Sequence, residues 1–112
     1  MTIHSEGEIF MAAYLLAVCE VTNPNENFKK YAVSSADLMH AHGGKYIVRG
    51  PAAEVLKGDE LKGKVLIISE FPDMEALQGF INDEKYVNEV APLREGTGNY
   101  NFACYESAPP MP

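Results

Sequence analysis

Two charged side chains on expected strands carry the first candidate chemistry of this chain. Arg49 ends a short strand over residues 45–49, and Glu70 lies in an apolar strand over residues 64–71. Side chains alternate along a strand, and we expect these two on the same sheet face. A guanidinium beside a carboxylate keeps it ionised, ready to accept a proton or orient a ligand. Glu70 is therefore a candidate catalytic residue and Arg49 a candidate substrate-binding residue, the alternative being a structural ion pair.

Three further residues are candidates by type. His42 is the candidate general acid or base, because imidazole titrates near neutral pH. It also precedes Gly43-Gly44 at an expected helix end, where a histidine stabilises the C-terminus, and we favour this structural role. Tyr86 and Arg94 are candidate substrate-binding residues at the rim of a pocket for an anionic or aromatic ligand. Their alternative roles are a core aromatic residue and a charge at a helix end.

The sequence predicts no metal site and no cofactor. His40 and His42 are two positions apart on the expected helix, so their side chains point about 200° apart and cannot share a metal. The segment 58–64 has the spacing of a phosphate-binding loop, but Val65 stands where that loop needs Ser or Thr. A strand rather than a helix is expected to follow it, which removes the nucleotide reading.

Composition limits the classes of partner. The chain has 112 residues, which suits one domain, and a formal net charge of -7 at pH 7. This charge repels phosphate backbones and anionic lipids, so we expect neither nucleic acid nor membrane as a partner. Cys19 and Cys104 each lie in an apolar run and are expected to be reduced, which favours the cytoplasm. The apolar run 9–19 lacks the basic flank of a secretion signal and is too short to span a bilayer.

Apolar spacing predicts the order strand, helix, strand, strand, helix, strand. Asn23-Pro24 marks the first helix start, with Glu26 at capping-box spacing, and Gly43-Gly44 marks its end. The expected strands cover 14–22, 45–49, 64–71 and 99–106, and the second helix follows Asp73, with another helical piece over 84–90 ended by Pro92. This order favours a ferredoxin-like α+β fold: a four-stranded antiparallel sheet with central first and third strands and both helices on one face.

The expected central strands are apolar on both faces, although helices would cover only one. We therefore expect a second copy of the chain on the other face, which makes a homodimer. The domain is expected over residues 12–106, with a leader or arm over 1–11. Residues 107–112 contain three prolines and are expected to form a flexible tail.

Short segments in a fixed order also resemble a known family. They are Tyr14-Leu15-Leu16-Ala17-Val18, His42-Gly43-Gly44, Val48-Arg49-Gly50, Gly58-Asp59, Ile68-Ser69-Glu70-Phe71-Pro72, Lys85-Tyr86 and Arg94. Together they resemble the bacterial family catalogued as domain of unknown function 1330, over nearly the whole span from Tyr14 to Glu106. The resemblance implies a dimeric α+β barrel, in which two ferredoxin-like sheets pack face to face. The chain departs from the family pattern near Gly58 and Phe80, where tryptophans are expected and it has none.

These observations lead to two functional hypotheses. In the first, a homodimer binds a small organic molecule and converts it by cofactor-independent acid-base or oxidative chemistry with Glu70, Arg49 and His42. In the second, the same fold is a non-catalytic ligand-binding or accessory dimerisation module. The sequence leaves open whether the protein is an enzyme.

Overall fold

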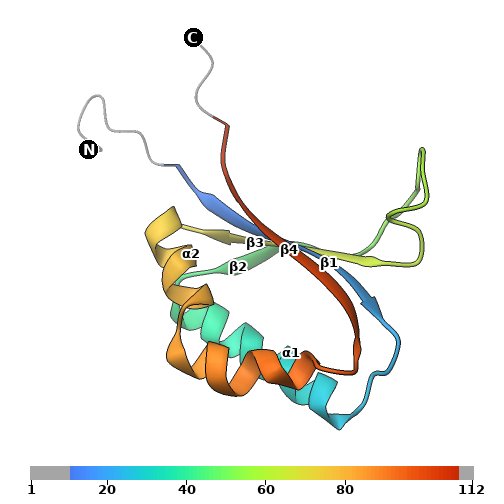
Figure 1. Cartoon of the computed structure of the whole chain (residues 1–112). Coiled ribbons are helices and arrows are strands. Elements are labelled where there is room, and N and C mark those ends of the chain that lie inside the picture. The colour runs from blue at the N-terminus through green and yellow to red at the C-terminus, as the bar shows by residue number, and fades with distance from the viewer. Residues whose placement is uncertain (1–10, 109–112) are drawn as a thin grey trace.

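The computed structural model describes residues 11–108 and contains the predicted antiparallel sheet (Figure 1). Its strands are β1 (Ala13–Val21), β2 (Lys45–Pro51), β3 (Val65–Phe71) and β4 (Gly98–Glu106), in the spatial order β2-β3-β1-β4. The helices α1 (Glu26–Ala41) and α2 (Met74–Ile81) both lie on one face of the sheet. The ferredoxin-like order, with the first and third strands central, is thus confirmed.

The first helix begins two residues later than the capping-box spacing predicted. Asn25 rather than Asn23 is the N-cap, and its Oδ1 accepts a hydrogen bond from the backbone N–H of Phe28 at 2.9 Å. Asn23 is held in the turn after β1, because its backbone N–H donates to the Thr97 carbonyl. At the other end the prediction holds: His42 is the C-cap, and Gly43 follows with φ of +86°.

The predicted helical piece over 84–90 is present, but the prediction that Pro92 ends it was wrong. The chain forms a wide helical turn, η1 (Tyr86–Val90), and then tightens into the 3-10 turn η2 (Ala91–Arg94). Pro92 lies in the first turn of η2, where a missing N–H leaves no hydrogen bond broken. The helical segment therefore continues through this proline to Arg94, and both turns pack against α1.

The hydrophobic core lies under the α2 end of the sheet. Its fully buried members include Phe71 on β3, Leu77 on α2 and Val90 on η1, with Met39 of α1 and Phe80 of α2 packed among them. Within residues 11–108, no helix is long and apolar enough to cross a membrane.

The opposite face of the sheet carries an apolar row in the described chain. Strand register places Val48, Ile68, Leu16 and Ala103 side by side across all four strands. Neither helix lies on this face (Figure 1). The apolar character of both faces, expected from the alternation in β1, is therefore present.

The predicted leader and tail lie almost wholly outside the described residues. Residues 1–10 and 109–112 are not described. Of the predicted tail, Ser107 donates its backbone N–H to the Ala12 carbonyl at 3.0 Å.

Candidate functional site

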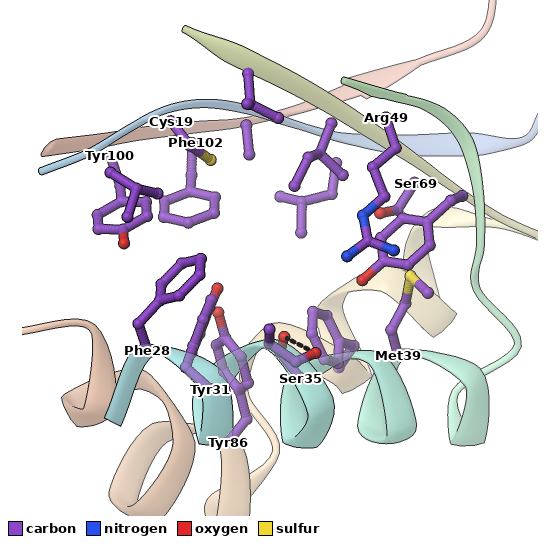
Figure 2. A pocket seen from close by; sticks show the side chains of 18 residues that line it. Cys19, Phe28, Tyr31, Ser35, Met39, Arg49, Ser69, Tyr86, Tyr100 and Phe102 are labelled. Atoms are coloured by element: carbon purple, nitrogen blue, oxygen red, sulfur yellow. Dashed lines mark hydrogen bonds between the residues drawn. The ribbon is translucent and has the colours of Figure 1, made fainter. Parts of the chain in front are cut away.

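A cavity of about 180 Å³ separates α1 from the helix-facing side of the sheet. α1 packs mainly against η1 and η2, and side chains of α1 and of the sheet line the space between them. Leu15, Ala17 and Cys19 line the cavity from β1, and Phe28 and Ala32 line it from α1. Figure 2 shows the sheet above this space and the helices below it. The lining is predominantly apolar, which suits an organic ligand.

One end of the cavity is aromatic. Tyr31 and Tyr86 point from the helical side toward Tyr100 and Phe102 on β4 (Figure 2). The ring centroids of Tyr31 and Tyr100 lie 6.5 Å apart, and those of Tyr100 and Phe102 lie 6.3 Å apart. Burial, followed by the neighbouring Tyr86 phenol, raises the pKa of Tyr31 far above its ordinary value. Ionisation of Tyr31 is therefore even less favourable than for an ordinary tyrosine, and its neutral hydroxyl can donate or accept a hydrogen bond.

The other end of the cavity carries a single positive charge. Arg49 projects from β2 into this end, and its Cζ lies 4.8 Å from the centroid of the Tyr46 ring (Figure 2). Among the described residues, no carboxylate lies within 4.0 Å of its guanidinium nitrogens. The guanidinium is thus oriented by an aromatic face and keeps its hydrogen-bond donors available.

The predicted Arg49–Glu70 pair does not form. An irregularity between Tyr46 and Val48 shifts the register of β2, so that Arg49 lies opposite Ile67 on the helix-facing side. A bulge adds one residue and moves every later side chain to the other face, which is why simple alternation failed. Arg49 and Glu70 consequently point to opposite faces of the sheet.

Glu70 lies on the face without helices, outside the cavity. Its Oε2 accepts a hydrogen bond from the Tyr14 hydroxyl at 3.1 Å, and its Oε1 lies 3.5 Å from Nζ of Lys45. The hydrogen bond to Glu70 raises the pKa of the Tyr14 phenol. Glu70, the catalytic candidate, therefore does not line the cavity.

His42 also lies outside the cavity lining. Its Nε2 donates to Oδ2 of Asp83 at 2.9 Å, joining the end of α1 to the start of the η1 segment. Oδ1 of Asp83 accepts hydrogen bonds from the backbone N–H groups of Lys85 and Tyr86 at 2.8 and 3.1 Å. The His42 hydrogen bond, then those from Tyr86 and Lys85, lower the pKa of Asp83. This arrangement supports the structural role for His42.

Replacing Asp83 by asparagine should remove part of the acid sensitivity of the fold. Because the folded-state pKa of Asp83 lies below the ordinary value of 3.8, its contribution to stability is present above that value. It is lost as the pH falls through the folded pKa. We expect Asp83→Asn to lower the temperature of unfolding at pH 7. This difference in unfolding temperature between variant and wild type should shrink as the pH falls below 3.8, the ordinary pKa of the carboxyl. Thermal unfolding from pH 7 to pH 3 measures this, with the exposed Asp37→Asn as control.

The last two candidates lie at or beside the aromatic end. Tyr86 is buried and lines the cavity, with its ring centroid 4.6 Å from that of Phe80. The Arg94 Cζ lies 4.5 Å from the ring centroid of Phe102 and 5.3 Å from that of Tyr31. Arg94 also donates from Nε to the Ala91 carbonyl at 3.4 Å. Arg94 supports the rings of the cavity from outside its lining.

The model of the family described as Domain of unknown function (DUF1330) matches residues 12–108. The chain belongs to this family. No curated protein matched the DUF1330 chain.

Three solved structures show the same fold. A protein of unknown function from Rhodopseudomonas palustris, RPA0582, has 18% identity and a TM-score of 0.67, covering 93% of this chain and 88% of that one. SnoaB, a cofactor-independent oxygenase from Streptomyces nogalater, has 10% identity and a TM-score of 0.59, covering 93% and 99%. A provisionally assigned antibiotic biosynthesis monooxygenase from Caulobacter crescentus CB15 has 14% identity and a TM-score of 0.57, covering 89% and 92%. At these identities the likeness shows the fold alone.

Sequence reasoning about the DUF1330 chain missed most of the cavity lining. Tyr100 and Phe102 alternate along β4, opposite Cys19 and Ala17 of β1. Their period of two could have placed both rings on the helix-facing side. Tyr31 lines the cavity from α1, but nothing in the sequence indicates that this face of the helix borders a cavity. In the described part of the chain, no group of three metal-ligating side chains occurs.

Proposed function

We propose that this protein binds a small organic molecule in the cavity between α1 and the sheet. The observation that carries the proposal is a cavity of about 180 Å³ with an apolar lining and one guanidinium. An engineered apolar cavity of about 150 Å³ is sufficient to hold benzene. A ligand here would fill space that α1 leaves under the sheet and would gain contacts with the lining side chains.

Binding is better supported than acid-base conversion. The cavity lining contains phenols, a thiol, hydroxyls and a guanidinium, but no carboxylate or imidazole within the described residues. Glu70 and His42, the two groups suited to proton abstraction, are engaged elsewhere. A non-catalytic binding module therefore accounts for the site best, because binding needs no general base in the lining.

Oxidative conversion is the second candidate, favoured by the fold shared with a cofactor-independent oxygenase. In this reading the cavity orients a substrate that itself reacts with dioxygen. Incubating a bound compound with the protein in air separates the two functions. Mass spectrometry detects added oxygen if the protein is an oxygenase and unchanged compound if it only binds.

The proposed assembly is a homodimer that packs through the sheet face without helices. Val48 and Tyr105 on this face have 41% and 52% of their surface exposed in the single chain. Lys45 and Glu70 lie on the same face and carry opposite charges. In a two-fold dimer, Lys45 of one copy can therefore face Glu70 of the other copy. An apolar sheet face with such edges fits a second copy of this chain.

A cavity-filling variant tests the binding function. Ala32 lines the cavity from α1, while the neighbouring Val33 has 63% of its surface exposed. We expect some compounds in a library of single-ring and two-ring molecules to raise the unfolding temperature of the wild type. The variant Ala32→Phe should lose this shift, because its ring occupies the cavity, whereas Val33→Phe should keep it. A wild type that no compound stabilises, or a shift that survives Ala32→Phe, would contradict the proposal.

A further inference from the structure

We propose that the cavity takes a small aromatic carboxylate, with its carboxylate on the Arg49 guanidinium and its ring against the aromatic side chains at the other end. This inference rests on the proposed ligand-binding function and assigns the chemical class of the ligand. It follows from the charge, the size and the lining of the cavity.

The two arginines of the chain differ in whether their charge is already engaged. The protein has a formal net charge of -7, and its two arginines are Arg49, which lines one end of the cavity, and Arg94, which lies behind the aromatic side chains of the other end and outside the lining. Arg94 is engaged, since it donates to the Ala91 carbonyl and is covered by the rings of Tyr31, Tyr100 and Phe102. Arg49 contacts one ring and has no carboxylate partner among the described residues. In so acidic a chain, an arginine facing a cavity without an acid indicates that the ligand supplies the acid.

A carboxylate fits this guanidinium better than a phosphate does. Two parallel N–H groups of one guanidinium match the two oxygens of one carboxylate. Among the described residues, Arg49 is the only cation in the lining, because the other titratable groups there are phenols and the Cys19 thiol. One guanidinium balances a single negative charge, whereas a phosphate dianion would keep one charge unpaired. Arg49 is also exposed at the outer strand β2, so the carboxylate stays partly hydrated and its desolvation penalty is small.

An aromatic body fits the remainder of the cavity. The volume of about 180 Å³ is close to the size that holds one benzene ring, with room for a substituent. Tyr31, Tyr86, Tyr100 and Phe102 surround the end away from Arg49 (Figure 2). Flat rings pack edge-to-face or offset against such side chains with a gain beyond simple burial. The ring therefore enters first, and the carboxylate remains at the guanidinium.

Benzoate and benzamide form a matched pair of probes, because they share a ring and differ in charge. Isothermal titration of the full chain should show benzoate binding about tenfold to a hundredfold more tightly than benzamide. Arg49→Gln should lower the affinity for benzoate by about the same factor and leave the affinity for benzamide unchanged. The benzoate affinity of Arg49→Lys should lie between those of the wild type and Arg49→Gln. Lys30→Gln, on the exposed side of α1, removes the same charge and should change neither. Circular dichroism confirms that each variant is folded.

The ring and the acid group are tested separately. Cyclohexanecarboxylate should bind several-fold more weakly than benzoate, since it lacks the flat ring. Phenylphosphate should also bind more weakly, and tighter binding would overturn the carboxylate assignment. Equal affinities for benzoate and benzamide, unaffected by Arg49→Gln, would overturn the inference while the binding function stands. If neither probe binds, the aromatic carboxylate is wrong, and the library screen with Ala32→Phe judges the binding function independently.

Discussion

Replacing Leu16 by aspartate should separate the proposed homodimer into monomers. Leu16 lies at the centre of the face without helices, between Ile68 on β3 and Ala103 on β4. In a two-fold interface each copy would bring its own aspartate, so two like charges would be buried together. Burial of unpaired charge costs several kcal/mol per ion, which corresponds to weakening of the dimer by about a thousandfold or more.

Light scattering after gel filtration measures the outcome directly. The wild type should have twice the chain mass of 12.3 kDa, and Leu16→Asp should have the single mass. Leu56→Asp is the matched control, because Leu56 lies in the loop between β2 and β3 with 86% of its surface exposed. A wild type that is already monomeric, or a Leu16→Asp variant that remains dimeric, would show that this face is not the interface.

The fold was predictable because its signals are local or repeat along the chain. Segment 14–22 carries apolar residues on both of its faces, which indicated a central strand. Gly43-Gly44 after His42 indicated the end of α1. The second helix was expected to follow Asp73, and Asp73 is its N-cap, since its Oδ1 accepts a hydrogen bond from the Ala76 N–H. These features depend on a few neighbouring residues, so a single sequence contains them.

The site was less predictable because it depends on register and on distant contacts. The segment Tyr46-Ile47-Val48, where the register of β2 shifts, contains no glycine or proline that would indicate a bulge. This bulge nevertheless determines which face Arg49 occupies. Similarly, His42 was recognised at its helix end, but its partner Asp83 is distant in sequence. The gap between α1 and the sheet depends on how η1 and η2 hold the helix, which no local pattern encodes.

Truncating Leu77 to alanine should remove a large part of the stability of the fold. Leu77 is 0% exposed and packs in the core under the α2 end of the sheet. A buried leucine replaced by alanine costs about 2–5 kcal/mol, out of about 5–15 kcal/mol for a typical domain. Denaturant unfolding should show a lower midpoint with an unchanged slope. Leu77→Met, which conserves volume, should cost less than about 1.5 kcal/mol.

The contrast with Leu15 distinguishes the core from the cavity. Leu15 is half-buried and lines the existing cavity, so its truncation removes fewer contacts than truncation of Leu77 does. We expect Leu15→Ala to cost clearly less stability and to shift ligand preference toward larger molecules, because the cavity becomes wider. Leu56→Ala, on the exposed loop, should change stability by less than about 0.5 kcal/mol. Equal losses for Leu77→Ala and Leu15→Ala would mean that α1 packs as tightly over the sheet as α2 does, leaving no space for a ligand.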